Sequence, residues 1–316
     1  MSGADQAPDE FGQIERLFRP LTRGAPEAFD LLDDAAAIPG RPGHDLIVTK
    51  DAMVEGVHFL PSDPPDLVAR KLLRVNLSDL AAKGAEPYGY FLATAWPRTF
   101  GWEARKQFAS GLAVDGERFG LVLLGGDTVS TPGPLSLSLT MLGWAPTGRM
   151  VRRSGARPGD LLMVSGTIGD GLLGLKAAHG DVSDPDGYLA GRYRVPNPRL
   201  DLREFLRATA TAAADVSDGL IADAGHIAKA SGVRARIELE RVPLSAAARA
   251  WAAAQADLFE ALSELAAGGD DYEVVCTAPR PLEGFTVIGA IEQGEGVELS
   301  WRGETRRPAK SGWKHG

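Results

Sequence analysis

Aspartates stand in this chain at positions where a solvated surface charge is not expected, and Asp79 is the clearest of them. Val68, Leu72, Val75 and Asp79 recur at steps of four, three and four residues, so they share one face of a helix predicted over 65–83. A carboxylate on such an apolar face is costly unless it is paired or bound to a cation. Asp79 therefore indicates a cation site, with a buried salt bridge or a cap as the alternatives.

Two further aspartates come shortly after apolar segments. Asp51 follows a strand predicted over 46–49, and Asp127 follows a buried strand predicted over 121–124. In open α/β sheets, ligands bind beyond the carboxyl ends of the strands. The pair Gly125-Gly126 would also let the backbone approach a ligand closely. Taken singly, each aspartate is equally consistent with a turn.

Acidic residues also cluster in three loops. Asp215-Val216-Ser217-Asp218-Gly219 precedes a predicted helix, and although an N-cap there explains one polar side chain, it does not require Asp215 as well. Gly268-Gly269-Asp270-Asp271-Tyr272-Glu273 and the pair Asp33-Asp34 add further carboxylates. Two unit negative charges ~4 Å apart repel by roughly 4 kcal/mol at an effective dielectric near 20. If these loops converge, oxygen-ligated divalent cations must neutralise them, and Mg²⁺ is favoured over zinc.

Composition narrows the class of protein. The chain has 316 residues, with 34 Lys+Arg against 42 Asp+Glu and a formal charge of −8, so a basic nucleic-acid footprint is not expected. The single cysteine, Cys276, excludes a disulfide framework and a Cys-based zinc site and is interpreted as a core thiol. No apolar stretch approaches the length of a membrane span, and the start lacks a signal pattern. We expect a soluble, cytoplasmic protein with no membrane partner.

Strands and helices alternate along the whole chain, which predicts an α/β (α+β) fold. Turn sequences near 146–160 place a domain boundary at about residue 150, giving domains 1–150 and 151–316. Strands are predicted over 46–49, 88–96, 121–124, 135–144, 161–164, 233–239, 272–277, 285–291 and 297–301. Helices are predicted over 11–18, 65–83, 102–119, 169–178, 199–213, 219–231 and 245–266.

Several well-known phosphate-binding and nucleophilic motifs are missing from the sequence. It contains no Walker-type phosphate loop, no protein-kinase signature set and no nucleophile elbow. Gly166-Thr167-Ile168-Gly169-Asp170-Gly171 lies between a predicted strand and a predicted helix, but its glycine spacing is wrong for a dinucleotide fingerprint. It is only a weak candidate for a phosphate loop.

Six segments in order resemble the thiamine-monophosphate kinase family, which belongs to the same superfamily as aminoimidazole ribonucleotide synthetase. The similarity runs from about Phe11 to Trp313. The segments are Asp51…Glu55-Gly56-Val57-His58-Phe59, Val75 to Ala85, Leu124-Gly125-Gly126-Asp127-Thr128, Arg153 to Asp160, Asp215 to Leu220, and Gly268 to Glu273.

The resemblance implies an enzyme, a phosphotransferase that uses ATP to phosphorylate thiamine monophosphate, giving thiamine diphosphate and ADP. It implies that Mg²⁺ ions are held by Asp34, Thr49, Asp51, Asp79, Asp127, Asp215 and Asp218. It places ATP and its phosphates at Gly126, Asp127, Arg153 and Ser217, and thiamine monophosphate at His58, Asp270 and Trp313. Asp51, Asp127 and Asp218 would be the catalytic residues.

The resemblance also implies an architecture. It predicts an N-terminal mixed-sheet domain that binds ATP and metal, a C-terminal α/β domain, and a site in the cleft between them. It further implies a homodimer formed through the N-terminal sheets, for which the strands at 88–96 and 135–144 are candidates.

Phosphoryl transfer requires positioning and charge neutralisation more than covalent chemistry by the protein. Because the acceptor is already an ionised phosphate oxygen, no strong general base is needed, and we expect direct in-line transfer without a phosphoenzyme. Three features depart from the family pattern. The first loop reads Asp30-Leu31-Leu32-Asp33-Asp34 where the family often has Gly-x-Gly-Asp-Asp. Lys50 stands where a small hydroxyl residue is usual, and Asp270 stands where a glutamate is expected.

Two alternatives remain at this point. One is another ATP-dependent synthetase, or a hydrogenase- or selenium-pathway relative, of the same superfamily; the His58-Phe59 segment and Trp313 favour the kinase. The other is a catalytically silent relative that binds Mg-ATP without forming product.

Overall fold

The computed structural model describes residues 8–306 and 312. The chain divides into two compact units. The first runs to Leu77 and resumes over Glu86–Gly148, and the second contains Ser78–Ala85 and the chain from Arg149 onward. The short segment Ser78–Ala85 therefore packs with the second half of the sequence, although it is flanked by residues of the first unit.

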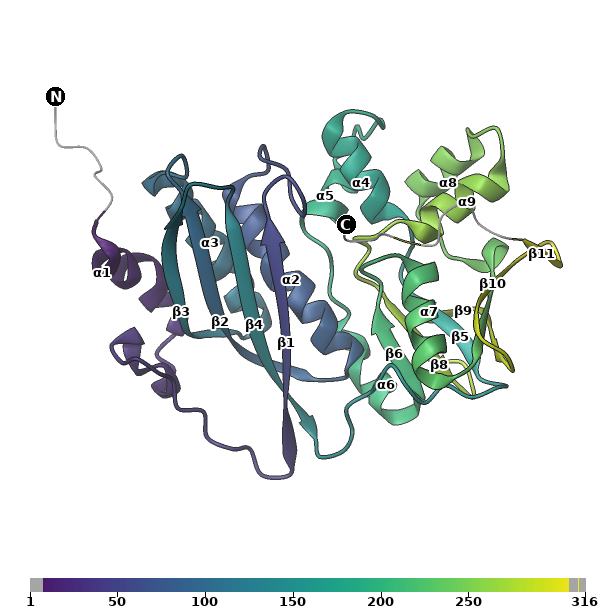
Figure 1. Ribbon diagram of the computed structural model, residues 1–316, viewed down its shortest axis with the longest axis horizontal. Helices are drawn as coiled ribbons and strands as arrows, with labels where there is room; N and C mark the ends of the chain where they lie inside the picture. Colours follow the sequence, from purple (N-terminus) through teal and green to yellow (C-terminus); the bar gives the residue numbers. More distant parts are fainter. Residues whose placement is uncertain (1–7, 307–311, 313–316) are drawn as a thin grey trace. The chain divides into compact units, whose positions relative to one another are not determined.

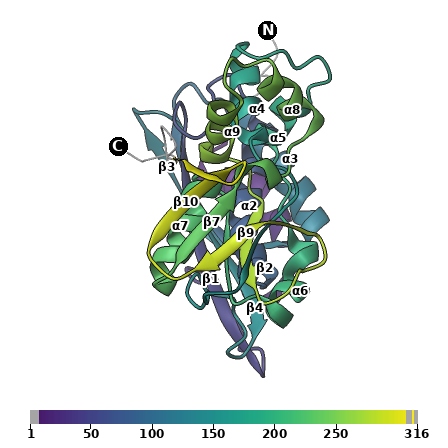
Figure 2. The ribbon, with the colours of Figure 1, turned by 90° about the vertical axis from the view of Figure 1, so that its right-hand side faces the viewer.

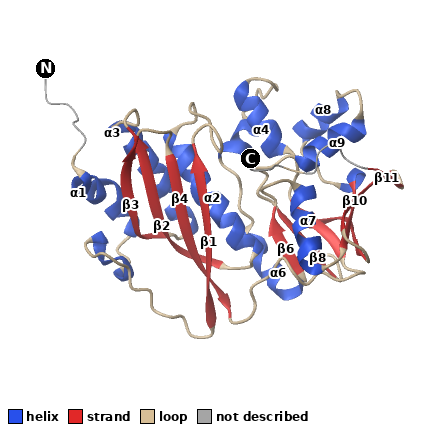
Figure 3. Cartoon of the chain, viewed as in Figure 1, coloured by secondary structure: helices blue, strands red, loops and turns tan. Residues whose placement is uncertain are grey.

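The first unit is a four-stranded mixed sheet with helices against one face (Figures 1 and 3). Its elements are α1 (Glu10–Gln13), η1 (Ile14–Phe18), η2 (Arg19–Thr22), η3 (Pro26–Leu31), β1 (His44–Val54), α2 (Pro65–Ala82), β2 (Glu86–Pro97), α3 (Trp102–Phe119), β3 (Val122–Thr131) and β4 (Ser136–Pro146). The last turn of α2 belongs to the second unit.

Strand β1 of this sheet is longer than its apolar residues predict, and so is β3. The strand order is β1-β4-β2-β3, with only β2 and β3 parallel. Asp51 pairs with Leu139 inside β1, and Asp127 pairs with Ala93 inside β3. The prediction that both aspartates follow strand ends is therefore wrong. Hydrogen bonding to neighbouring strands extends each strand beyond its apolar run, which the local sequence does not reveal.

The two long helices of the first unit match their prediction closely, whereas the helix predicted over 11–18 is the short α-helix α1 followed by the π-helix η1. The helix α3 has the predicted bounds, and α2 differs from its prediction only at the end. Gly84 follows α2 with a φ of +69°, the left-handed conformation that ends many helices. The buried residues of α2 include Leu72, Leu73 and Leu77, so its apolar stripe forms part of the core.

The second unit is built on a seven-stranded sheet of order β11-β10-β7-β9-β5-β8-β6. Figure 2 shows β10, β7 and β9 side by side in this sheet. Its elements are β5 (Leu161–Ser165), α4 (Asp170–His179), α5 (Tyr188–Arg194), η4 (Leu200–Leu202), α6 (Arg203–Thr209), β6 (Ala212–Asp215), α7 (Leu220–Ser231), β7 (Arg234–Glu238), η5 (Leu239–Arg241), α8 (Ala246–Ala253), α9 (Leu258–Ala267), β8 (Val274–Ala278), β9 (Phe285–Glu292), β10 (Gly296–Trp301) and β11 (Glu304–Arg306).

Three predictions for this half need correction. The alanine run at the end of the helix predicted over 199–213 forms the strand β6, which is fully buried beside β8. Alanine favours helix intrinsically, but small side chains also fit an enclosed strand, and the tertiary context prevails. The helix predicted over 245–266 is two helices, because Asp257 caps a separate helix α9. The elements α5 and β11 were not predicted.

The segment Ser78–Ala85 is bound to the second unit by packing and hydrogen bonds. Ala82 belongs to an apolar cluster with Met163, Ala213 and Cys276. The Nζ atom of Lys83 donates to the carbonyl of Ala213 at 2.8 Å, and the Lys83 carbonyl accepts from Val151 N. Asp79 is therefore positioned by the second unit. Cys276 is fully buried in this cluster, as predicted.

Among the described helices, none has the combination of length and apolar character needed to cross a membrane.

Candidate active site

Thr49 and Asp51 lie on the same face of β1, because side chains two residues apart in a strand point the same way. Lys50, between them, is exposed on the opposite face. The backbone N–H of Asp51 donates to Oδ1 of the fully buried Asn76 in α2, at 3.2 Å. β1 is an edge strand of its sheet, and Asn76 reaches the Asp51 N–H from α2. Asn76 thus supports the Asp51 backbone, a role not predicted from sequence.

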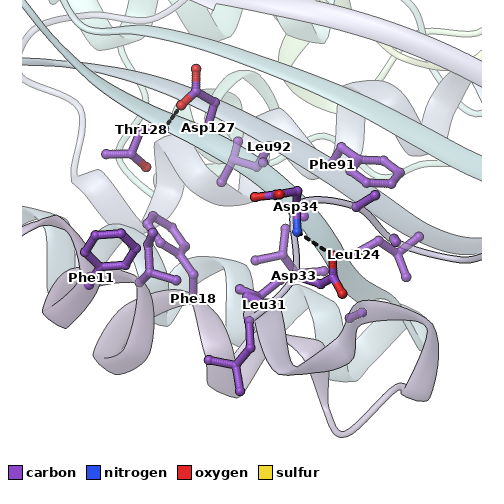
Figure 4. Close-up of a pocket in the computed structure, with 18 residues that line it drawn as sticks. Phe11, Phe18, Leu31, Asp33, Asp34, Phe91, Leu92, Leu124, Asp127 and Thr128 are labelled. Atoms are coloured by element: carbon purple, nitrogen blue, oxygen red, sulfur yellow. Dashed lines mark hydrogen bonds between the residues drawn. The ribbon is translucent and has the colours of Figure 1, made fainter.

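Asp34 and Asp127 line one cavity of about 470 Å³ in the first unit. Figure 4 shows the rings of Phe11 and Phe18 together at one side of this cavity, with the two carboxylates away from them. Gly126 also lines the cavity, and a Cβ there would lie 1.9 Å from the carbonyl oxygen of Leu92. The cavity therefore combines an apolar wall, two carboxylates and a backbone that only glycine allows to approach β2 so closely.

The strand register separates Asp51 from Asp127. Across the neighbouring strands, Asp51 is in register with Leu139, Leu92 and Gly126. Asp127 is in register with Ala93, in the next row of paired residues. Adjacent rows of a sheet point to opposite faces. The two aspartates therefore do not meet at one edge of the sheet, and their shared metal role stays a prediction.

Three charged residues of the second unit act on Lys83. Burial lowers the pKa of the Lys83 ammonium, and the charge of Arg153 acts in the same direction, while Asp215 and Asp79 raise it. Asp215 is 5% exposed at the end of β6. The predicted ligands Asp79 and Asp215 and the predicted nucleotide residue Arg153 thus all influence the charge of Lys83. Lys83, which no sequence argument singled out, supplies a second positive charge.

The loop carrying Ser217 and Asp218 is held by the helix that follows it. Both backbone N–H groups donate to one oxygen of Asp223, at 3.0 and 3.1 Å. Ligand atoms of Asp218, Asp223 and His226 all lie within 4.8 Å of one another. Burial raises the pKa of Asp223 to about 7, and the neighbouring Asp218 charge contributes to the rise.

The segment 268–273 runs along this loop. The N–H of Asp270 donates to the carbonyl of Ser217 at 3.0 Å, and the N–H of Tyr272 donates to that of Val216 at 2.8 Å. Asp270, the predicted substrate residue, is therefore next to the predicted nucleotide and metal loop. Asp270 and Tyr272 both have positive φ, 67° and 51°, which marks a strained backbone held by its surroundings.

The two buried carboxylates of the same segment, those of Asp271 and Glu273, anchor it to the interior of the second unit. Glu273 is fully buried and accepts from Arg199 and Ser165, with Arg192 at 3.0 Å. Asp271 accepts from the N–H groups of Gly169 and Gly171. The weak phosphate-loop candidate over 166–171 therefore already binds a carboxylate of the chain itself. Burial raises the pKa of Asp271 to about 8 against the effect of these two N–H donors.

His58 is half-buried in the turn after β1 and has a defined tautomer. The backbone N–H of Val54 donates to its Nδ1 at 3.1 Å. Since a backbone N–H only donates, Nδ1 must accept, and the neutral ring carries its proton on Nε2. The carbonyl of His58 accepts from the buried Lys71 ammonium at 3.0 Å. The donor of the neutral His58 ring is therefore Nε2–H.

Trp313 lies outside the described residues, so its predicted contact with substrate stays a prediction. Its neighbour Gly312 is described, and a Cβ there would lie 2.5 Å from Cβ of Ala222 and 3.1 Å from the carbonyl oxygen of Asp218. The chain thus passes beside the start of α7 one residue before Trp313.

The predicted metal ligands fit Mg²⁺ by their chemistry. They are carboxylates and one hydroxyl, the hard oxygen donors that Mg²⁺ prefers, and no described thiol accompanies them. The imidazole near Asp218 belongs to His226, which is exposed.

Family models match most of the chain. The N-terminal domain model of AIR synthase related proteins matches residues 32–145, and the C-terminal domain model matches residues 157–302. The mixed sheets, the helices and the carboxylate-rich loops therefore define a two-domain protein of the AIR synthase related family, and the predicted fold class is confirmed.

Within this class, the chain belongs to the thiamine-monophosphate kinase family. It is 57% identical to the thiamine-monophosphate kinase of Caulobacter vibrioides over 98% of this chain and 91% of that protein. The crystal structure of thiamine-monophosphate kinase from Stenotrophomonas maltophilia superposes with a TM-score of 0.81 at 36% identity, covering 94% and 98% of the two chains. AaThiL complexed with AMPPCP and TMP superposes with a TM-score of 0.78 at 31% identity, covering 99% and 100%.

Proposed function

We propose that this protein transfers the γ-phosphate of ATP to thiamine monophosphate, giving thiamine diphosphate and ADP. The observation that carries the proposal is the 57% identity to a thiamine-monophosphate kinase across nearly the whole of both chains. A solved relative that binds AMPPCP and TMP supports an ATP-type nucleotide as one substrate.

The nucleotide suits the cavity of the first unit. A volume of about 470 Å³, with Phe11 and Phe18 at one side and Asp34 and Asp127 away from them, matches a ligand with a flat apolar ring and an anionic end. Anionic phosphate beside carboxylates requires a cation, which is the role proposed for Asp34 and Asp127. Gly126 would let a phosphate approach the backbone of β3.

The second unit supplies the groups proposed to act on the phosphates. Asp79, Asp215 and Asp218 would hold Mg²⁺, which when bound neutralises phosphate charge and stabilises the charge that develops during transfer. Arg153 and Lys83 add fixed positive charge near Asp215 and Asp79. Ser217 would donate its hydroxyl to the nucleotide phosphates. The same proposal assigns Thr49 and Asp51 of β1 to the metal ligands.

The phosphate acceptor is proposed to bind at His58, Asp270 and Trp313. His58 would donate from Nε2 to an acceptor atom of thiamine monophosphate, and Asp270 would accept from a donor on it. No residue need abstract a proton, because the attacking phosphate oxygen is ionised at neutral pH. The proposed transfer is therefore direct, without a phosphorylated residue on the protein.

A homodimer formed through the open face of the first unit's sheet is part of this proposal. Leu46, Val48 and Val129 are apolar side chains of β1 and β3 that are 41%, 56% and 49% exposed. Covering such side chains is favourable. The cytoplasmic location expected from the sequence stays a prediction.

The direct test is turnover. Purified protein is incubated with Mg-ATP and thiamine monophosphate, and thiamine diphosphate is detected by thiochrome fluorescence after separation. Wild type and the surface control Glu103→Gln should form product, while Asp127→Asn and Asp218→Asn should form none although their circular dichroism is unchanged. Absence of product with wild type that binds Mg-ATP would instead identify a silent relative.

A further inference from the structure

Asp223 touches the predicted nucleotide and metal loop without being one of its predicted ligands. Asp223 lies in the first turn of α7 and is 1% exposed. The atom Oδ2 accepts from Ser217 N at 3.0 Å and from Asp218 N at 3.1 Å. One buried oxygen thus binds two consecutive backbone N–H groups.

These two hydrogen bonds are not those of an ordinary helix cap, because they bind N–H groups that precede α7 rather than the first N–H groups of the helix. The residue at the N-cap of α7 is Gly219, which has no capping side chain and a φ of +112°. A Cβ at Gly219 would lie 2.6 Å from the carbonyl oxygen of Ala267, so the chain must turn there without a side chain. Asp223 therefore determines how the residues before this turn are oriented.

Ser217 is fixed from both sides of its backbone. Asp223 binds its N–H, and its carbonyl accepts from Asp270 N at 3.0 Å. With both polar backbone groups engaged, the conformation at Ser217 is defined, and the side chains of Ser217 and Asp218 remain half-exposed for a ligand.

We propose that Asp223 is a positioning residue for phosphoryl transfer, whose buried oxygen sets the backbone of Ser217 and Asp218 so that their hydroxyl and carboxylate meet the nucleotide and Mg²⁺ without rearrangement. The inference rests on the proposed function. Groups that orient metal ligands in this way commonly alter metal affinity or activity by 10- to 100-fold when removed, so a comparable loss, about tenfold or more, is expected here.

The test compares Asp223→Ala, which removes the acceptor, with Asp223→Asn, which keeps an oxygen at the same reach but removes the charge. For Asp223→Ala, we expect the Mg²⁺ concentration for half-maximal activity to rise about tenfold or more and kcat to fall, with KM for thiamine monophosphate unchanged. In Asp223→Asn, the Mg²⁺ concentration for half-maximal activity and kcat should both stay close to their wild-type values. If Asp223→Asn is as impaired as Asp223→Ala in a folded protein, the charge itself acts and the positioning role is wrong.

A matched control is available in the same unit. Oδ1 of Asp257 also accepts from two backbone N–H groups, those of Phe259 at 2.8 Å and Glu260 at 3.2 Å, at the start of α9. Asp257→Ala should lower the melting temperature and leave the Mg²⁺ dependence unchanged. An equal shift of the Mg²⁺ dependence in Asp257→Ala would reduce the effect of Asp223 to general destabilisation and overturn the proposal.

A measurement without turnover separates this proposal from the proposed function. Amide hydrogen exchange of Ser217 and Asp218, followed by NMR on the ligand-free protein, should be slow in wild type and in Asp223→Asn. It should be fast in Asp223→Ala or, if that variant does not fold, in Asp223→Ser, whose hydroxyl cannot reach both N–H groups. Equal exchange rates in all of these proteins would contradict the positioning role whether or not the enzyme makes thiamine diphosphate.

Discussion

The hydroxyl of Tyr272 donates a hydrogen bond to Oδ1 of Asp270 at 3.0 Å. Both residues have positive φ, and each is followed by a buried acidic residue that anchors the segment. The tyrosine hydroxyl thus supports the carboxylate of Asp270. Tyr272 is therefore a partner of the proposed substrate residue, although the sequence showed it only as part of the acidic motif.

Removing the Tyr272 hydroxyl should weaken binding of the phosphate acceptor. For Tyr272→Phe, we expect KM for thiamine monophosphate to rise about five- to tenfold, corresponding to the loss of roughly 1 kcal/mol from one hydrogen bond, with KM for ATP unchanged. Steady-state kinetics with each substrate varied in turn measures this. The matched control is Tyr188→Phe, which removes a similar hydroxyl from Asp170. A change in KM for ATP alone would contradict the assignment.

The tautomer of His58 gives a second prediction. Because Nδ1 accepts from Val54 N, ¹⁵N NMR should show an unprotonated Nδ1 and a protonated Nε2 at neutral pH. His58→Gln keeps a donor near the Nε2 position, whereas His58→Asn keeps only an acceptor near Nδ1. We expect His58→Gln to retain the lower KM for thiamine monophosphate. A proton found on Nδ1, or the reverse order of the two variants, would show that His58 does not donate from Nε2.

Asp271 should make stability fall as pH rises. Burial raises its pKa in the folded protein to about 8, far above its value in an unfolded chain, about 3.9. Its stabilising contribution is therefore fully present below about pH 4 and is lost as pH rises through about 8. Urea unfolding across this range should show a steeper decline for wild type than for Asp271→Asn. A difference between the two that does not vary with pH would contradict the raised pKa.

Gly126 should not tolerate a side chain. A Cβ would lie 1.9 Å from the carbonyl of Leu92, its partner across β2 and β3, so Gly126→Ala must push the two strands apart. We expect about 1–3 kcal/mol of destabilisation and a weaker affinity for ATP, from thermal unfolding and nucleotide titration. Gly40→Ala is the control, because nothing lies within 4 Å of a Cβ there. Wild-type stability in Gly126→Ala would show that the sheet can relax.

The sequence predicts local features best where one helix or one turn determines them. The helix α3 has its predicted bounds because its periodicity and the following Gly120 act within the segment itself. The extents of β1 and β3 depend on pairing with distant strands, so the positions of Asp51 and Asp127 within them could not be found locally. The alanine run of β6 is a strand because of its buried place in a sheet, against its own helix propensity.

Residues of the candidate site were likewise predictable only where a local motif marks them. The motif containing Asp215 and Asp218 is visible in the sequence, but Asp223 is not, because its role consists of two hydrogen bonds to backbone N–H groups. The sequence marks Asp223 only by its position: it is an acidic residue on the apolar side of the first helical turn after the motif. Likewise, only the folded structure shows that Asp271 binds the loop 166–171, because these residues are far apart in the chain.

In the proposed mechanism, these aspartates bind the divalent ions used in phosphoryl transfer. The most direct measurement is a crystal structure of the protein with AMPPCP, thiamine monophosphate and Mn²⁺ in place of Mg²⁺, in which anomalous scattering locates each ion. We predict Mn²⁺ coordinated by Asp127 and by Asp79, Asp215 and Asp218, with phosphate oxygens completing the ligand sets. Bound nucleotide with no Mn²⁺ on these carboxylates would contradict the account.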